Sequence, residues 1–121
     1  MSVLSKLFGE SGTRSVSPVE ARELMRTGAV MVDVREKSEW DAGHVAKAKH
    51  FPLGGLASSK SRLPGDRTLI VVCRSGNRSA RATKMLAKAG FDAVNLTGGL
   101  TEWKAAGLPL VNSRRKQGSV R

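Results

Sequence analysis

The residues best suited to chemistry lie in one short segment, 69–80, which reads LIVVCRSGNRSA. Cys73 is the only cysteine of the chain, and it stands where a β-branched apolar run ends and a loop with Gly76 and two arginines begins. A loop of this kind turns several backbone N–H groups toward one point, and the helix predicted to follow adds the positive end of its dipole. Such surroundings lower the pKa of a thiol from its usual value of about 8.5. The segment therefore predicts a thiolate beside an anion-binding loop, here called the cysteine loop (residues 73–79).

Length and composition indicate one globular domain. The chain has 121 residues, of which 40% are hydrophobic and 26% are charged, enough for a hydrophobic core. A single cysteine excludes an intramolecular disulfide and a metal site made of several cysteines, and we expect neither a metal nor an organic cofactor. A lone thiol is best kept reduced, and the first residues lack the apolar stretch of a signal peptide. We therefore expect a cytoplasmic protein.

The charge is strongly positive, with a formal net charge of +11. Residues 112–121 contain four basic residues and no acid. Two interpretations stay open for this charge: a solvated basic surface with a flexible tail, or a surface that binds nucleic acid or an acidic partner. The aromatic residues are two Trp and three Phe, with no Tyr, so stacking platforms for bases are few and we do not expect nucleic-acid binding.

Apolar runs alternate with helical stripes, which indicates an α/β fold with a parallel sheet. The runs 29–34 and 68–72 are nearly continuous, as is typical of buried parallel strands. In such sheets ligands bind beyond the carboxyl ends of the strands, where Cys73 lies. The remaining predicted elements are helices at 17–27, 36–42, 53–62, 79–89 and 100–105, and short strands at 48–51 and 93–96.

The predicted helices also have predicted inner faces. Ser17 and Glu20 have capping-box spacing, with Pro18 at the first helical position, and Gly28 should end this helix. We expect Val19, Leu24 and Met25 of the first helix, and Ala82, Met85, Leu86 and Ala89 of the fourth, to face inward.

Four segments in sequence order resemble the signatures of the rhodanese family of thiosulfate-type sulfurtransferases. They are VDVR at 32–35, EWDAGHVAKA at 39–48, VCRSGNRS at 72–79, and Gly98-Gly99 with Trp103 and Gly107-Leu108-Pro109. The resemblance extends over residues 17–110. One departure is Val45-Ala46-Lys47, where the family usually has Ile-Pro-Gly.

This resemblance implies a rhodanese-like three-layer α/β fold, with a mostly parallel central sheet and helices on both faces. The composition of the two ends adds domain bounds of 16–111: the small, polar residues 1–15 predict a flexible N-terminal arm, and residues 112–121 predict a basic flexible C-terminal tail. The implied reaction moves a sulfane sulfur from thiosulfate, or a related anionic donor, to a thiophilic acceptor such as cyanide or a thiol. Cys73 is the implied nucleophile and carries the sulfur as a persulfide.

The chemistry of the loop agrees with that reaction, because attack on the donor needs a thiolate and an anionic donor needs positive charge beside it. Arg74 and Arg78 supply that charge, and the backbone N–H groups would hold negative sulfur. Asp33 and Arg35 should support the site from the neighbouring strand, or form a purely structural ion pair. The expected substrate-binding residues are Arg74, Ser75, Gly76, Asn77, Arg78 and Ser79.

Two other functions compete with sulfur transfer. A phosphatase of the cell-cycle dual-specificity type has five residues between its cysteine and arginine, whereas four separate Cys73 from Arg78 and none of them is acidic. The basic tail favours a second alternative, a non-enzymatic interaction module or a protein-to-protein sulfur relay. We expect a monomer whose partners are a small anionic sulfur donor and a thiophilic acceptor, with a protein acceptor as a further partner and no membrane.

Several side chains near these motifs have both a functional and a structural interpretation. Glu39 could orient an arginine or be a plain exposed acid. His44 fits a turn that defines the fold better than a catalytic base, and His50 should lie at the surface. The remaining expectations are packing roles for Trp40 and Trp103, and a pocket rim formed by Leu53, Gly54 and Leu56.

Overall fold

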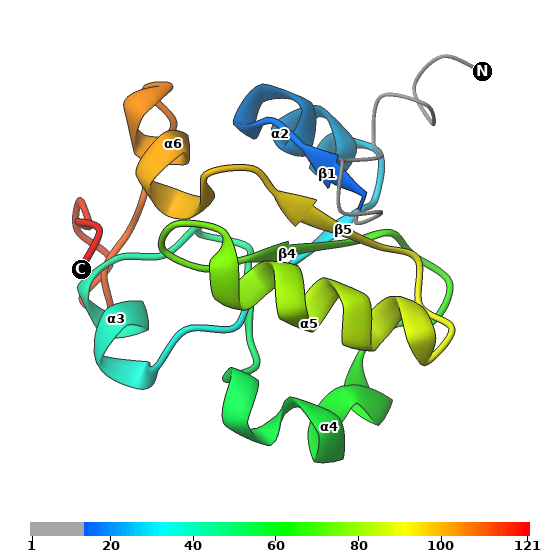
Figure 1. Cartoon of the computed structure of the whole chain (residues 1–121). Helices are drawn as coiled ribbons and strands as arrows, with labels where there is room; N and C mark the ends of the chain where they lie inside the picture. Colours follow the sequence, from blue (N-terminus) through cyan, green and yellow to red (C-terminus); the bar gives the residue numbers. More distant parts are fainter. Residues whose placement is uncertain (1–13) are drawn as a thin grey trace.

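The structure, a computed structural model, describes residues 14–121. Five strands form one sheet in the order β1-β5-β4-β2-β3, and every pairing is parallel. Helices cover both faces of this sheet, so the predicted three-layer α/β fold is confirmed (Figure 1). The strands are β1 (Ser15–Val16), β2 (Val30–Asp33), β3 (Lys49–His50), β4 (Leu69–Val72) and β5 (Ala93–Leu96). The helices are α2 (Pro18–Arg26), α3 (Lys37–Ala42), α4 (Leu56–Ser59), α5 (Asn77–Lys88) and α6 (Gly99–Ala105).

The sheet separates two hydrophobic clusters, because successive residues of a strand face opposite sides. In β4, Ile70 and Val72 pack in one cluster with side chains of α2 and α6, whereas Leu69 and Val71 pack in the other with side chains of α4 and α5. All four residues are fully buried. Cys73 continues this alternation and belongs to the α5 side. The apolar run thus fixes the face on which the thiol lies.

Helix α2 begins at the predicted capping box. The Ser17 hydroxyl accepts a hydrogen bond from the Glu20 N–H (3.2 Å), and the Glu20 carboxylate accepts one from the Ser17 N–H (2.8 Å). Leu24 and Met25 pack on the core as predicted, but the prediction for Val19 was wrong, since this side chain is 51% exposed. Ala21 is buried instead, because it precedes Leu24 and Met25 by three and four positions and so shares their face of the helix, whereas Val19 lies on the opposite face.

The buried face of helix α5 also differs from the prediction at one end of the helix. Ala82 and Leu86 are fully buried and Met85 packs partly against them, as predicted, whereas Ala89 is exposed at the C-cap. Thr83 is buried and donates its hydroxyl hydrogen to the Ser79 carbonyl oxygen (2.7 Å). The buried stripe therefore runs from Ser79, in the first turn of α5, to Leu86 and ends before Ala89.

The predicted helix at 53–62 is three short pieces. A 3-10 turn at Leu53–Gly55 precedes α4, and a second at Lys60–Arg62 follows it. Gly54 and Gly55 weaken helix formation here. Leu56 is fully buried in the core, so it does not belong to a pocket rim.

The two ends of the chain differ from expectation where they are described. Ser15 was placed in a flexible arm, but it pairs with Asn95 in the edge strand β1; the rest of that predicted arm, 1–13, lies outside the described residues. Within 14–121, no helix combines the length and apolar character needed to cross a membrane.

The C-terminal segment, residues 112–121, packs against α3 where we predicted a flexible tail. Val111 forms antiparallel bridges with His44 and with Gln117, and the Ser119 N–H donates to the Ala42 carbonyl oxygen (3.0 Å). A Cβ atom on Gly43 would collide with the backbone of Ser119. The packing thus depends on a glycine in α3's C-cap and on backbone hydrogen bonds, neither of which gives a charge or hydropathy signal.

Candidate active site

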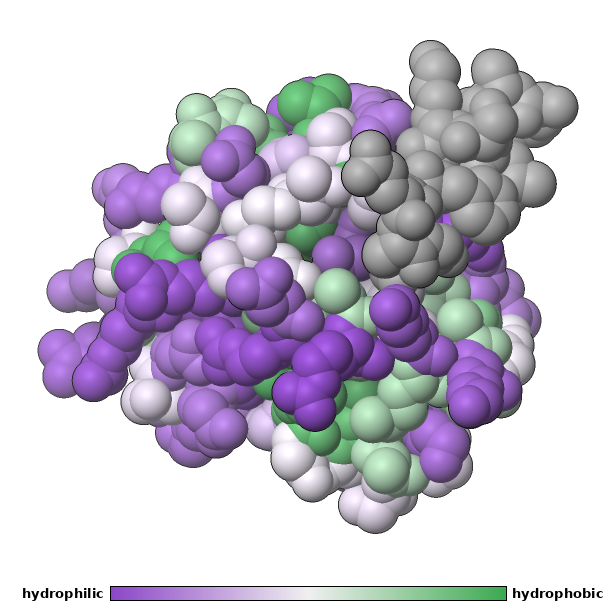
Figure 2. Space-filling model, viewed as in Figure 1, coloured by the Kyte–Doolittle hydropathy of each residue, from purple (hydrophilic) through white to green (hydrophobic). Residues whose placement is uncertain are grey.

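The cysteine loop connects β4 to α5 at the carboxyl edge of the sheet. In Figure 1 this loop lies on the same side of the molecule as α3, α6 and the C-terminus. Figure 2 shows a strongly hydrophilic band across the face that carries the loop and α5. Parallel strands bring their carboxyl ends to one edge of the sheet, so residues that are distant in sequence can meet around Cys73.

The Cys73 sulfur accepts three hydrogen bonds from the loop that follows it. The donors are the Gly76 N–H at 3.1 Å, the Ser79 N–H at 3.4 Å and the Ser79 hydroxyl at 3.3 Å. Gly76 has a left-handed backbone (φ 107°), which permits the loop to turn its N–H inward. These donors form the predicted anion-binding surroundings of the thiol.

The same contacts also shift the pKa of Cys73. Burial raises the pKa of the thiol, but the Ser79 hydroxyl and the N–H groups of Ser79, Gly76 and Ser75 outweigh burial, so the net pKa is lowered. Donors that point at sulfur stabilise the thiolate more than the thiol. The site therefore holds a larger fraction of the nucleophilic thiolate than a free thiol would.

Cys73 is nevertheless 1% exposed and packs beside apolar side chains of the α5 face. Its sulfur thus lies at the bottom of the loop rather than on the surface. A reactant must reach it end-on through the mouth of the loop, which favours small or slender groups.

Two hydrogen bonds from outside the loop hold its backbone in place. The Asn95 side-chain amide, from β5, donates to the Gly76 carbonyl oxygen (3.3 Å). At the other end of the loop, the Leu100 N–H donates to the Cys73 carbonyl oxygen (2.9 Å). Helix α6 can come this close because Gly99 has no side chain: a Cβ atom there would overlap the backbone of Cys73 and Arg74.

Arg78 does not stand free beside the sulfur. Its guanidinium donates two hydrogen bonds to the Glu39 carboxylate, with Nη1–Oε1 2.7 Å and Nη2–Oε2 2.8 Å. The Arg78 hydrogen bond lowers the pKa of Glu39 to about 2 despite the opposing effect of burial, and the same bond raises the pKa of Arg78. Of the two interpretations of Glu39, the structure thus shows the one in which it orients an arginine.

Arg74 differs from Arg78 in its surroundings. Its side chain is exposed and makes no ion pair within residues 14–121. Of the two arginines of the loop, Arg74 is therefore the one whose charge has no partner among the described residues.

Asp33 and Arg35 form a fully buried ion pair behind the site. The Asp33 carboxylate accepts hydrogen bonds from Nε (2.9 Å) and Nη2 (2.8 Å) of Arg35, and Nη2 also donates to the Gly43 carbonyl oxygen (2.6 Å). The pair thus joins the end of β2 to the end of α3, the helix that carries Glu39. Neither side chain donates a hydrogen bond to the Cys73 sulfur.

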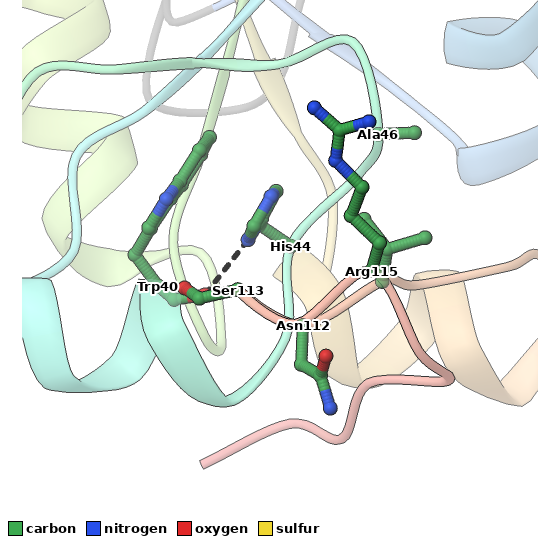
Figure 3. A pocket seen from close by; sticks show the side chains of 7 residues that line it. Trp40, His44, Ala46, Asn112, Ser113 and Arg115 are labelled. Carbon is green, nitrogen blue, oxygen red and sulfur yellow. Dashed lines mark hydrogen bonds between the residues drawn. The ribbon is translucent and has the colours of Figure 1, made fainter.

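The two histidines contact Trp40 rather than the sulfur. The His44 ring stacks on Trp40 (centroids 3.7 Å apart) and donates from Nδ1 to the Trp40 carbonyl oxygen (2.8 Å). In Figure 3 it lies between Trp40 and Arg115, in a hollow of about 530 Å³. His50, expected at the surface, is half-buried on the other side of Trp40 and donates to the Arg35 carbonyl oxygen (2.7 Å). Both rings are therefore structural.

Sequence reasoning missed two groups that touch the loop. The Ser79 hydroxyl was not expected to face the sulfur, although its place in the first turn of the helix was a usable signal. Asn95 was missed as well, and its signal was a polar residue inside an apolar strand. Among residues 14–121, no cluster of three His, Cys, Asp or Glu side chains could hold a metal ion.

Comparison with known proteins gives the class of this fold and site. Residues 17–106 match the rhodanese-like domain family, and the chain belongs to that family. It is 37% identical over 93 residues to the thiosulfate sulfurtransferase GlpE of Ectopseudomonas mendocina, covering 76% of this chain and 85% of that protein.

Two further relatives show the range of the likeness. The chain is 38% identical over 94 residues to the probable adenylyltransferase/sulfurtransferase MoeZ of Mycobacterium tuberculosis, and this match covers 74% of the chain but only 24% of MoeZ. A rhodanese-related protein from Thermoplasma volcanium has a crystal structure that superposes with a TM-score of 0.77 at 32% identity, covering 81% of this chain and 97% of that one. These relatives support a rhodanese-type sulfurtransferase.

Proposed function

We propose that this chain moves a sulfane sulfur from thiosulfate, or a related anionic donor, to a thiophilic acceptor through a persulfide on Cys73. The observation that carries the proposal is the set of three hydrogen bonds donated to the Cys73 sulfur by Gly76 and Ser79. Hydrogen-bond donors that already point at a sulfur anion need no rearrangement when charge develops there.

In the first half of the reaction, the Cys73 thiolate attacks the outer sulfur of thiosulfate. A new S–S bond forms on Cys73, the S–S bond of thiosulfate breaks, and sulfite leaves with the electron pair. The thiolate is the reactive form, and the lowered pKa of Cys73 raises its fraction at neutral pH.

In the second half, the acceptor attacks the outer sulfur of the persulfide. The bond between this sulfur and Cys73 breaks, and its electron pair returns to Cys73 as a thiolate. Cyanide leaves as thiocyanate, and a thiol leaves as its own persulfide. The enzyme returns to its starting state with no external oxidant or reductant.

We propose the following roles for the neighbouring residues. Arg74 is the open cation for the anionic donor, and Arg78, held by Glu39, lines the loop with a fixed guanidinium. Asp33 and Arg35 support this arrangement from behind. The N–H groups of Ser75, Gly76, Asn77 and Ser79 complete the substrate-binding set.

Mass spectrometry of the intact protein after thiosulfate treatment tests the proposal. We expect a gain of about 32 Da, one sulfur atom, on Cys73, and its loss with thiocyanate formation when cyanide is added. Cys73→Ser should neither gain the sulfur nor turn over, while its circular dichroism stays that of the parent. Turnover in this variant, or an unmodified parent, would overturn the proposal.

A reducing compartment, the cytoplasm, suits an unpaired thiol of this reactivity. We also propose a monomer, because the described fold buries its two cores without a partner chain.

A further inference from the structure

We propose that a turn near the C-terminus docks an acidic segment of a partner protein, and that an apolar side chain of this segment enters the hollow beside α3. The turn, here called the basic turn, comprises residues 112–116 and reads NSRRK. It lies beyond residues 17–106, the part that matches the rhodanese-like domain family, so the family match does not account for it. The inference does not depend on sulfur transfer.

The basic turn has an ordered backbone. The Asn112 N–H donates to the Lys116 carbonyl oxygen (2.8 Å), and the Arg115 N–H donates to the Asn112 carbonyl oxygen (2.9 Å). The Asn112 side-chain oxygen accepts hydrogen bonds from the N–H groups of Arg114 (2.9 Å) and Lys116 (3.0 Å). A surface that is already ordered loses less conformational freedom when a partner binds.

The turn is also attached to the rest of the domain. The N–H and the hydroxyl of Ser113 donate to the carbonyl oxygen (3.1 Å) and the carboxylate (2.8 Å) of Asp41, in α3. Val111, just before the turn, exchanges two backbone hydrogen bonds with His44 (2.8 and 2.9 Å). The cations of the turn are therefore presented from a fixed position beside α3.

Arg115 occupies a backbone conformation that suits glycine. Its φ is 61°, and it is the only residue other than glycine with a positive φ within 14–121. Its guanidinium forms no ion pair with any described residue. Figure 3 shows this side chain extending alongside the His44 ring, at the hollow. Because glycine would fit the turn with less strain, we infer that the Arg115 side chain serves binding rather than folding.

The charge of this surface is positive and uncompensated. Arg114, Arg115, Lys116 and Lys47 are exposed, and none of them forms an ion pair within the described part of the chain. Asp41 is already bound to Lys37 (2.6 Å). Carboxylates are the complement of such a surface.

The hollow adds an apolar element to the surface. It has a volume of about 530 Å³ and is lined by Trp40, His44, Ala46, Val111, Ser113 and Arg115. This volume lies in the usual range for ligand sites, roughly 300–1,000 Å³, and is sufficient for an aromatic or aliphatic side chain. An apolar anchor in a pocket with charged groups at its rim is the usual anatomy of a protein interface.

Other macromolecules fit this surface less well. Single-stranded nucleic acid needs open aromatic faces for its bases, but the Trp40 ring is covered by His44 (centroids 3.7 Å apart) and by His50 (4.8 Å). A membrane surface needs exposed apolar side chains to insert. Among residues 14–121 the only large hydrophobic side chain that is strongly exposed is Val19, which belongs to α2. An acidic protein segment is therefore the partner that the surface favours.

The first test measures binding of a fluorescein-labelled peptide, with four glutamates around a Leu-Phe pair, by fluorescence anisotropy at low salt. We expect Arg115→Glu to weaken binding about tenfold. Lys84→Glu, the same charge change at an exposed position of α5, is the matched control and should weaken it by about twofold at most. A peptide with two serines in place of the Leu-Phe pair should bind about tenfold more weakly to the parent.

Three results of this test would overturn the inference. They are no binding by the parent at about 1 mM peptide, equal effects of the two variants, and equal affinity of the two peptides. A uridine oligonucleotide and phosphatidylserine vesicles test the other kinds of partner. Both should respond equally to the two variants, and a selective loss in Arg115→Glu would assign the surface to that partner instead.

The two tryptophans of the chain give an internal control for the position of the peptide. Trp40 lines the hollow, whereas Trp103 is buried and its indole N–H donates to the Pro109 carbonyl oxygen (3.0 Å). In ¹⁵N-labelled protein the peptide should shift the indole signal of Trp40 and leave that of Trp103 in place. An unshifted Trp40 signal would contradict binding in the hollow.

Arg115→Gly separates binding from folding. Glycine adopts a φ of 61° without the steric cost of a Cβ atom. The urea midpoint of this variant should therefore equal or exceed that of the parent, while its affinity for the peptide falls about tenfold. A lower midpoint together with the loss of binding would show that Arg115 serves the fold, and would overturn the inference.

Discussion

The carboxylate of Glu39 binds the guanidinium of Arg78 through two hydrogen bonds of 2.7 and 2.8 Å, and so connects α3 to the first turn of α5. The Glu39 carboxylate also accepts a hydrogen bond from the Glu36 N–H (3.0 Å), at the start of its own helix. Arg78 is thereby fixed in direction while 36% of its side chain remains exposed. The arginine of the cysteine loop is thus positioned by a helix that lies 39 residues earlier in the chain.

Glu39→Gln should lower kcat/KM for thiosulfate by about 10- to 100-fold, because a released Arg78 no longer has a fixed direction at the cysteine loop. Steady-state transfer to cyanide measures this. Glu23→Gln, which alters an exposed ion pair with Arg26, is the control and should leave turnover unchanged. Full activity of Glu39→Gln would show that the orientation of Arg78 does not matter.

The Glu39 pair should also make stability depend on pH. Its pKa is about 2 in the folded protein against an ordinary value of 4.5, so its contribution is present above about pH 4.5 and is lost as the pH falls toward 2. We expect the free energy of unfolding of the parent to exceed that of Glu39→Gln by about 2 kcal/mol at pH 6, a value reduced for solvent screening of Arg78. At pH 3 the difference should be smaller. Urea unfolding at the two pH values measures this, and a constant difference would contradict it.

Ser79→Ala should raise the pKa of Cys73, because the Ser79 hydroxyl is the strongest of the donors that lower it. The rate of alkylation by iodoacetamide as a function of pH gives this pKa. The parent should titrate below about 8.5 and the variant above the parent. Ser75→Ala is the control, since it keeps the backbone N–H that faces the sulfur and should leave the titration in place.

Asp33→Asn should destabilise the fold by about 3–5 kcal/mol, because it leaves the Arg35 guanidinium buried without a counter-charge. Chemical unfolding of the purified variant measures the loss. Arg26→Ala breaks an exposed pair and should leave the midpoint nearly unchanged. A similar small effect for both variants would mean that the buried pair can be replaced without cost.

Gly99→Ala should abolish activity by pushing α6 away from the cysteine loop, since its new Cβ atom would overlap the carbonyl oxygens of Cys73 and Arg74. Gly90→Ala is a matched control: its φ is also positive (98°), but nothing lies within 4 Å of the new Cβ atom. It should cost about 1–2 kcal/mol of stability and keep its turnover. Equal activity of the two variants would contradict the close approach of α6.

The sheet and the site could be predicted where the signal is local. The apolar run before Cys73 predicted β4, and Gly76 with the following helix predicted donors around sulfur. The sequence left the ion pair between Glu39 and Arg78 ambiguous, because the two residues are distant in sequence and either could equally be a solvated charge. Nothing in hydropathy indicated that the C-terminal residues pack on α3, since Gly43 and Gly118 act through the absence of side chains.

Errors in the inner faces of the helices have a different cause. Val19 precedes Leu24 and Met25 by five and six positions, so it falls on the opposite face of α2. Ala89 follows helical spacing, but it lies at the C-cap of α5, where the direction of the helix relative to the sheet decides what is covered. That direction depends on tertiary packing rather than on the local sequence.

All five strands run the same way, so the turns that precede them gather on the rim opposite the reactive thiol. The turn before β4 contains Gly65, around which there is open space. A fluorophore or surface tether attached there would not block the access of reactants to Cys73. This rim is therefore a suitable attachment site for single-molecule or immobilised assays.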